Sequence, residues 1–235
     1  MTQNAWNTST LESAGDGKIL IGSGSGRPTA ANITAGTSVS ITNGTNSITV
    51  GKSSGGSGNW ILISTATASA SSSINFTGLS STYFMYVIRF SNLAPATDQT
   101  TLWLRTSTNN GSSYDAGASD YNWNTLHLDS SGTQTSSLDT ADSSIELMGP
   151  TGGSNEMGNG SNESGSGFIY IFNPSHSKVT YVYMDGFYFN ESGSNNAEWT
   201  AGYRDSTTAV NAVRIMMDSG NIATGDFVLY GVTAS

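Results

Sequence analysis

The sequence predicts an all-β protein, with a small N-terminal β-hairpin module followed by a jelly-roll-like antiparallel β-sandwich. Charged residues make up only 11% of the 235-residue chain. Ser, Thr, Gly and Asn replace them, and these residues disfavour helix. After residue 59, runs of aromatic and aliphatic residues recur about every 8–12 residues, the spacing of sandwiches. No stretch has sustained helical periodicity.

The N-terminal part is expected to hold a β module. Four segments are predicted: a docking or flexible N-terminus (1–15), an oligomerising β module (16–50), a Gly/Ser linker (51–58) and the sandwich (59–235). The module begins with a strand at Lys18–Ile21. Asn43-Gly44 lies between two alternating runs, a pattern typical of a hairpin with a two-residue turn. That turn pairs Thr42 with Thr45 and Val39 with Ile48.

One face of this hairpin is apolar and small. Its members are Val39, Ile41, Ile48 and Val50. An isolated hairpin of this size is marginal in water, so its apolar face must pack on something else. The alternatives are the downstream domain and further copies of the same module, and we expect copies arranged as a homotrimer.

Ten strands are expected in the sandwich. They are Trp60–Thr65, Ser73–Thr77, Tyr83–Phe90, Thr101–Thr106, Ser144–Met148, Phe168–Phe172, Lys178–Asn190, Glu198–Arg204, Ala212–Met217 and Asp226–Val232. Tyr83–Phe90 is apolar on both faces, which predicts a central strand. Leu102 and Leu104 alternate with Trp103 and Arg105, so the leucines should point inward. Ten antiparallel strands predict two packed sheets.

Charge and composition exclude several classes of partner. The net charge is −9 and the sequence has no basic patch, so no nucleic-acid partner is expected. No window holds 18 apolar residues, and membrane insertion is not expected. The absence of cysteine excludes disulfides, zinc–thiolate sites and a thiol nucleophile. The first residues do not have the pattern of a signal peptide. Together with a composition suited to an exposed particle surface, this favours a virion location.

Two long polar segments are predicted to be loops, Asn109–Asn124 and Gly149–Gly167. Aromatic side chains on or near such loops are candidates for stacking on sugar rings. The candidate glycan-binding residues are Tyr114, Tyr121, Trp123, Trp199 and Tyr203. The alternative for Trp123 and Trp199 is a place in the core.

The first loop is also a candidate calcium site. Its possible oxygen ligands are Asp115, Asp120, Asn122 and Asn124. Calcium takes several oxygen ligands, but the spacing is not that of an EF-hand. The alternative is that these are solvated loop residues, and no other cofactor is expected.

The residues that catalysis would need do not form a recognisable motif. Gly22–Gly26 has no helix after it, so a phosphate loop is not expected. His127 and His176 lie in different segments and are expected at the surface or at strand edges. Two carboxylate pairs have a spacing that a glycosidase could use. These pairs are Asp115 with Asp120 and Glu191 with Glu198. We expect no enzyme, and we expect Arg105 and Arg204 to pair with carboxylates at strand ends.

Three segments carry a resemblance to known proteins. They are Gly15–Thr29 with Thr34–Val50, Trp60–Trp123, and Ser219–Val232. The first, which contains Gly-Asp-Gly-Lys-Ile-Leu-Ile-Gly and Ile-Thr-Asn-Gly, resembles a module of tailed-bacteriophage fibre and spike proteins. The other two are similar to the sandwich often attached to it.

The resemblance implies a surface location, oligomerisation and receptor binding, and it carries over no catalytic residue. The expected function is that of a tail fibre or spike subunit. Its N-terminus would dock on other virion proteins, and its sandwich would bind a host-surface glycan. The alternatives are a head decoration or capsid fibre protein and a glycan depolymerase spike.

Overall fold

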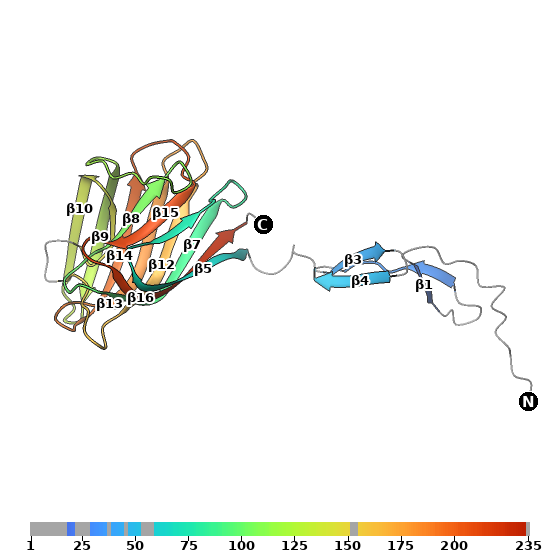
Figure 1. Ribbon diagram of the computed structural model, residues 1–235, viewed down its shortest axis with the longest axis horizontal. Helices are drawn as coiled ribbons and strands as arrows, with labels where there is room; N and C mark the ends of the chain where they lie inside the picture. The colour runs from blue at the N-terminus through green and yellow to red at the C-terminus, as the bar shows by residue number, and fades with distance from the viewer. Residues whose placement is uncertain are drawn as a thin grey trace, which may run out of the picture. The chain divides into compact units, whose positions relative to one another are not determined.

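The computed structural model describes residues 18–21, 29–36, 39–44, 47–52, 59–150 and 155–233. The chain divides into two compact units, Met1–Gly58 and Asn59–Ser235 (Figure 1). All strands pair antiparallel, and the described residues form no helix, so none of them supplies a membrane-spanning one. The predicted all-β class with a sandwich is confirmed.

The N-terminal unit contains two strand pairs. They are β1 (Lys18–Ile21) with β2 (Thr29–Asn32), and β3 (Val39–Gly44) with β4 (Ser47–Lys52). The sequence predicted the first strand but not its partner β2. The second pair is the predicted hairpin, and β4 continues through Gly51 and Lys52, which were assigned to the linker.

The register of this hairpin differs from the prediction. Thr42 pairs with Thr49 rather than with Thr45, and Val39 pairs with Lys52 rather than with Ile48. Asn43 and Gly44 therefore belong to β3 and are not the turn. Both registers keep the same parity, so the four predicted apolar residues still share one face.

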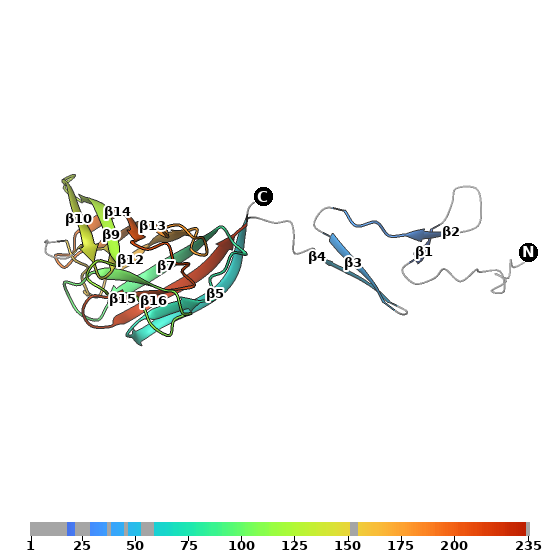
Figure 2. The ribbon, with the colours of Figure 1, turned by 90° about the horizontal axis from the view of Figure 1, so that it is seen from above.

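The sandwich has a large and a small antiparallel sheet. The large sheet has the order β10-β9-β14-β13-β12-β7-β16-β5, and the small sheet has the order β11-β8-β15-β6. The large-sheet strands are β5 (Trp60–Ser71), β7 (Met85–Pro95), β9 (Tyr121–Asp129), β10 (Gln134–Asp142), β12 (Gly165–Phe172), β13 (Tyr181–Phe189), β14 (Asn195–Arg204) and β16 (Ile222–Val232). The small-sheet strands are β6 (Ile74–Thr77), β8 (Leu102–Ser107), β11 (Ile145–Met148) and β15 (Ala212–Met217). Figure 2 shows the large sheet running from β10 at one side to β5 at the other.

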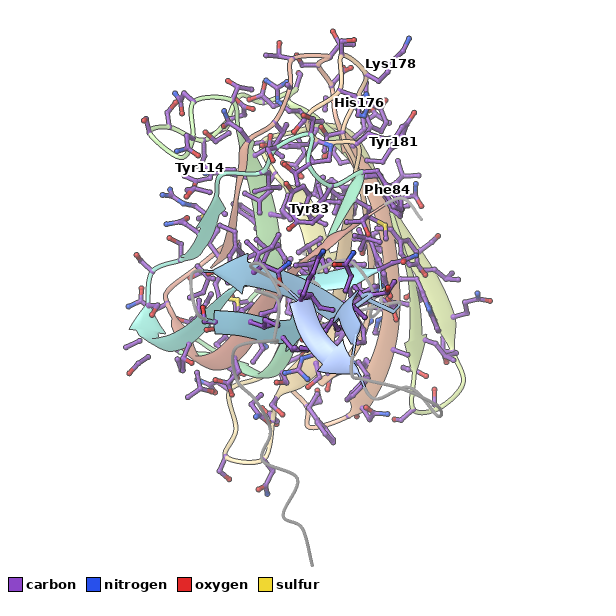
Figure 3. All side chains as sticks on the ribbon, turned by 90° about the vertical axis from the view of Figure 1, so that its right-hand side faces the viewer. Tyr83, Phe84, Tyr114, His176, Lys178 and Tyr181 are labelled. Carbon is purple, nitrogen blue, oxygen red and sulfur yellow. The ribbon has the colours of Figure 1, made fainter. Side chains whose placement is uncertain are left out.

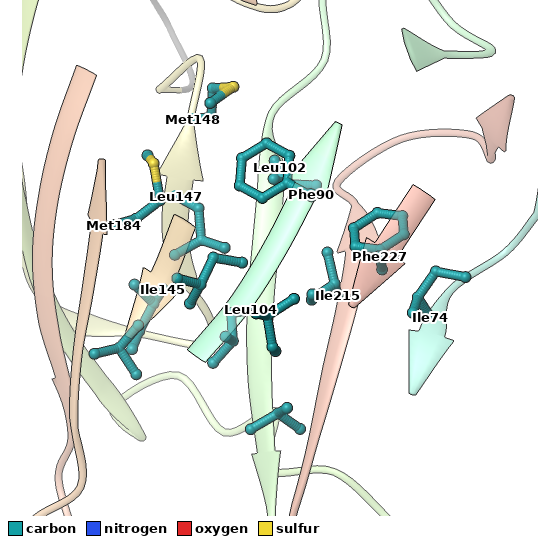
Figure 4. Close-up of a cluster of buried hydrophobic side chains, with 14 of the residues drawn as sticks. Ile74, Phe90, Leu102, Leu104, Ile145, Leu147, Met148, Met184, Ile215 and Phe227 are labelled. Atoms are coloured by element: carbon teal, nitrogen blue, oxygen red, sulfur yellow. The ribbon is translucent and has the colours of Figure 1, made fainter. Parts of the chain in front are cut away.

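Alternate side chains of the two sheets meet in one apolar core. Phe90 and Phe227 come from the large sheet, with ring centroids 6.3 Å apart, and Leu104 and Ile215 face them from the small sheet (Figure 4). The predicted inward direction of Leu102 and Leu104 is confirmed. β7 lies between β12 and β16, which confirms that Tyr83–Phe90 marks a central strand.

Two strands of the sandwich were missed, β9 and β10, and β9 alters one predicted loop. β9 begins at Tyr121, so the loop expected to reach Asn124 ends at residue 120. β9 and β10 form a hairpin whose turn is held by Asp129. Its Oδ1 accepts backbone N–H groups from Ser131 at 2.9 Å and Thr133 at 2.8 Å. Such aspartate-centred turns are a recognisable sequence feature, here Asp129-Ser-Ser-Gly132.

Candidate binding groove on the outer face of the large sheet

The face of the large sheet that points away from the small sheet is rich in aromatic side chains. Along β12, Gly165, Gly167, Ile169 and Ile171 are buried, whereas every second residue points outward and is half-buried. The neighbouring strands alternate in the same way, because successive side chains of a strand point to opposite faces. The outward aromatic residues are Trp60, Phe168, Tyr170, Phe172, Tyr181, Tyr183, Phe187, Phe189, Trp199, Tyr203 and Tyr230.

This outer face contains a groove with a volume of about 490 Å³. It lies where β9 and β13 begin and β14 ends, with β10 and the end of β12 beside them. Its lining residues are Asn122, Trp123, Asn124, Leu138, Asp139, Thr140, Phe172, Tyr181, Val182, Tyr183, Ala201, Gly202 and Tyr203. Tyr181 is 52% exposed, so a large aromatic surface is available to a ligand.

The tyrosines of the groove are held by ring contacts. Tyr181 and Tyr203 are register partners with ring centroids 6.1 Å apart, and Tyr183 lies 5.8 Å from Tyr170. Burial raises the pKa of the Tyr183 hydroxyl, and the Asp185 carboxylate raises it further. The Tyr183 hydroxyl therefore keeps its proton at physiological pH, and the ring contacts position these side chains before any ligand arrives.

The β10 side of the groove is shaped by a bulge. The register between β9 and β10 shifts between Asp139 and Asp142. The indole Nε1–H of Trp123 donates to Asp142 Oδ2 at 2.8 Å, which fixes the strand beside the shift. Bulges often re-aim side chains next to binding sites. Here Asp139 and Thr140 border the groove, opposite Asn122 and Asn124 of the neighbouring strand β9.

The predicted glycan-binding residues do not form one site. Tyr203 lines the groove, and Trp199 lies on the same outer face at 38% exposure. Tyr121 and Trp123 point the other way and are buried, so Tyr121 is not free to bind a ligand. Trp123 takes the alternative place in the core, although it is also among the lining residues of the groove. Tyr114 packs under Arg214, whose guanidinium carbon is 4.0 Å from the ring centre. Figure 3 shows Tyr114 well away from Tyr181.

Sequence reasoning missed the tyrosines of β13. Tyr181 and Tyr183 alternate with Val182 and Met184, so the aromatic residues occupy one face and the core residues the other. This alternation was visible in the sequence. The alternation did not show that the aromatic face is exposed to solvent, because a strand buried on both faces can have the same alternation of aromatic and aliphatic residues.

The four predicted calcium ligands do not converge. Asp115 accepts a hydrogen bond from Arg204 Nε at 2.6 Å, in the only ion pair among the described residues, and another from the Thr106 hydroxyl. β9 places Asn122 and Asn124 on its outer face, whereas Tyr121 and Trp123 point inward. Within the described part of the chain, no three His, Asp or Glu side chains form a metal-binding group. The predicted calcium site is therefore not assembled.

The two arginines expected to pair with carboxylates behave differently. Arg204 does so with Asp115. Arg105 instead donates to the backbone carbonyl of Ser143 at 3.0 Å and stacks on Trp103 at 5.4 Å. For Arg105 the prediction is wrong: it makes no ion pair with a described carboxylate, although Glu146 lies on the neighbouring strand β11.

The inner side of β9 and β14 carries a buried polar cluster that the sequence did not predict. Glu198, His127 and Tyr188 are its central members, and the expectation of a surface position for His127 is wrong. Glu198 Oε2 accepts the backbone N–H of Gly149 at 2.8 Å, and the Tyr188 hydroxyl donates to the carbonyl of Asn155 at 2.6 Å.

Burial dominates the electrostatics of this cluster. It raises the pKa of Glu198 to about 8, and Glu146 adds to the rise, whereas hydrogen bonds from Gly149 and Tyr188 oppose it. Burial lowers the pKa of His127, so both side chains favour their neutral forms. The predicted pair of Glu191 and Glu198 does not face a common cleft, since Glu198 is enclosed in the core and Glu191 is only half-buried.

Comparison with protein-family models, curated proteins and solved structures returned no match for this chain.

Proposed function

We propose that this chain is a structural subunit of a tailed-bacteriophage particle, a tail fibre or spike component, and that its sandwich attaches to a host-surface glycan. The observation that carries the proposal is the groove that places exposed Tyr181 beside Tyr203, Asn122 and Asn124. Aromatic rings offer rigid contact area at low entropic cost, and amide groups can both donate to and accept from sugar hydroxyls.

The chemistry of the groove favours a neutral glycan. No Lys or Arg lines it, and the chain carries a net charge of −9. An acidic polysaccharide would meet repulsion without a compensating cation. Each such site would be weak, so several copies on one particle would supply the adhesion through effective concentration.

The groove favours binding over cleavage. Asp139 is the single carboxylate residue in its lining. Glycoside hydrolysis normally uses two carboxyl groups about 5–9.5 Å apart. We therefore prefer a non-catalytic adhesin to a depolymerase. A head decoration or capsid fibre protein of the same architecture is the remaining alternative, and adsorption assays separate the two positions.

The test is glycan binding by the purified chain, measured by calorimetry or saturation-transfer NMR against neutral and acidic host polysaccharides. The wild type should bind a neutral glycan, and Tyr181→Ala should weaken binding at least tenfold. Tyr114→Ala changes an aromatic residue away from the groove and should bind like the wild type. Equal weakening by both variants, or release of reducing ends from the polysaccharide, would contradict the proposal.

A further inference from the structure

A second feature of the outer face lies beside the groove and is separate from it. It is a run of exposed apolar side chains that crosses the sheet, here called the apolar band. Its members are Trp60, Leu62, Leu126, Leu128, Phe187, Phe189 and Trp199, which are 37–59% exposed. On β9 and β13 these residues occupy the end of the strand opposite to the groove residues.

Register and ring contacts make the band continuous. Leu126 is the partner of Trp199, and Leu128 and Phe187 flank Ala197. Trp60 lies 6.4 Å from Phe168, which is joined through Asp185 to Trp199 in one row across the sheet. Leu126, Leu128, Phe187 and Trp199 therefore form one patch. Trp60 and Leu62 lie in the rows of Tyr181 and Tyr183, and Phe168 joins Trp60 to that patch.

The size of the band matches one side of a stable interface between copies. Large apolar side chains present about 150–250 Å² each when fully exposed, so these seven present roughly 600 Å². A standard interface takes about 800 Å² from each partner, and homodimer interfaces are about 65% apolar, which requires roughly 500 Å² of apolar surface. The band lies at the upper end of the range for the largest apolar patch of a typical monomer, about 300–600 Å², and such patches are often functional.

The few charges near the band are complementary to each other but unpaired. Arg89 and Asp185 lie on either side of Phe168 in the same row. Arg89 is exposed and has no ion pair in the described part of the chain. Asp185 likewise makes no ion pair with any described residue; its Oδ1 is buried without a hydrogen-bond partner, and the Tyr170 hydroxyl hydrogen-bonds to its carboxyl group. When two copies face each other, Arg89 of one can reach Asp185 of the other, and a symmetric assembly repeats the contact.

A glycan does not fit the band, because leucine and phenylalanine side chains offer no hydrogen bonds to sugar hydroxyls. A protein surface that is itself apolar does fit. We propose that the apolar band is covered by a second copy of this chain, with Arg89 of one copy paired to Asp185 of the other. This contact is independent of glycan binding and separate from the hairpin face in the N-terminal unit.

The first test is sedimentation velocity of the full-length chain over a concentration series. The wild type should associate at micromolar concentration. The double variant Leu128→Ser, Phe187→Ser should raise the dissociation constant at least tenfold. Tyr181→Ser, an equally exposed change in the groove, should leave association unchanged and reduce glycan binding. A wild type that stays monomeric at 50 μM (about 1.2 mg/mL), or a double variant that associates normally, would overturn the proposal.

The second test reverses the charges, so that a folding defect cannot mimic the result. Arg89→Glu and Asp185→Lys should each raise the dissociation constant about tenfold, because each places like charges in contact. The variant with both changes should recover at least half of the lost association in logarithmic units, since the pair is restored in reverse. Additive weakening in the combined variant would refute the Arg89–Asp185 pairing. Glycan binding measured on Arg89→Glu and on the double variant Leu128→Ser, Phe187→Ser should not change, which separates this outcome from failure of the proposed function. Asp185 is not used for this comparison, because its carboxylate acts on Tyr183 in the groove.

Discussion

At the residue scale, tyrosines of similar sequence context have different roles because strand alternation directs them to opposite faces. Tyr121 is fully buried and its hydroxyl joins two segments. The oxygen accepts the backbone N–H of Thr106 at 2.7 Å, and the O–H donates to the carbonyl of Asp115 at 3.2 Å. Tyr203 on β14 instead borders the groove with its ring half-buried. Chemical type alone therefore does not identify the ligand-binding residues.

Tyr121→Phe should lower the free energy of unfolding by about 1–3 kcal/mol, because the Thr106 N–H would remain buried without its acceptor. Tyr203→Phe, at the half-buried site, should change it by less than about 0.5 kcal/mol. Urea denaturation followed by fluorescence measures both. Similar effects for the two variants would contradict the assignment of Tyr121 to the core.

Glu198 makes stability depend on pH. Its pKa is raised by burial to about 8. The folded state therefore holds the proton where the unfolded state has lost it, and stability present below the unfolded pKa is lost as the pH rises toward 8. His127 acts in the opposite direction, because its lowered pKa reduces stability as the pH falls below its usual range.

The contribution of His127 fades above about pH 6.5, as the unfolded imidazole loses its proton, and it is small above about pH 7.5. Between pH 6.5 and 8, the free energy of unfolding should fall by up to about 1.4 kcal/mol per pH unit. Glu198→Gln should remove most of this slope, whereas Glu163→Gln, a change in a half-buried loop residue, should keep it. Denaturation at three pH values measures the slope. If Glu198→Gln kept the full dependence of the free energy of unfolding on pH, that dependence would belong to other titratable groups.

At the scale of single elements, the hairpin of β3 and β4 shows that a turn motif does not fix register by itself. Asn43-Gly44 is a strong turn signal, yet both residues pair with β4, Asn43 with Ile48 and Gly44 with Ser47. The shift extends the ladder, because Val39 and Lys52 become partners at its open end.

The chain has no cysteine, so introduced pairs report this register directly. Cysteines at Ile41 and Val50, or at the adjacent pair Thr42 and Thr49, should form an intrachain disulfide, since directly opposed Cβ atoms are about 4.5–5.5 Å apart. Successive pairs alternate in geometry, so one of the two should oxidise more readily. Peptide mass spectrometry identifies the bond. Cysteines at Val39 and Ile48, the sequence-predicted pair, should stay reduced, and efficient oxidation there would favour the predicted register.

β12 needs glycine at position 167, where it pairs with Gly186 of β13. A Cβ at Gly167 would lie 2.4 Å from the carbonyl oxygen of Asp185 and 2.8 Å from the Cα of Gly186. Both contacts are backbone and cannot move away as a side chain would. Gly167→Ala should therefore lower the free energy of unfolding by about 1–3 kcal/mol. Ser166→Ala, one residue away on the outer face, should have little effect, and thermal melting compares the two.

At the scale of the whole molecule, the sandwich is expected to be self-sufficient. Every residue of the core cluster lies between Ala68 and Leu229. A chain that begins at Asn59 should therefore unfold cooperatively, within about 3 °C of the sandwich transition in the full chain. Calorimetry measures the transition. Loss of cooperative unfolding would contradict the division into two units.

The same truncation addresses the expected homotrimer. Association that survives removal of residues 1–58 would place the main contact on the apolar band. Association that is lost, while the sandwich still melts normally, would place it on the hairpin residues Val39, Ile41, Ile48 and Val50. Sedimentation of the truncated chain distinguishes these outcomes.

The sequence by itself determined the all-β class, the inward leucines of β8 and the central position of β7. These follow from composition and from two-residue periodicity, which act locally. It missed β10 because Leu138 is its only large apolar residue, and it missed β9 because Tyr121 and Trp123 stand between polar residues and were assigned to the preceding loop. β10 is an edge strand of the large sheet and most of its side chains are exposed, so polar residues are tolerated there on both faces.

Tertiary structure alone decided which aromatic residues are exposed. Tyr121, Trp123, Tyr181 and Trp199 all occur in alternating strands, and periodicity shows only that neighbours point in opposite directions. Which direction is the core depends on where the small sheet packs, and that is set by contacts between residues far apart in the chain. The groove and the apolar band exist because the small sheet packs on one face of the large sheet, which leaves the aromatic side chains of the other face at the surface.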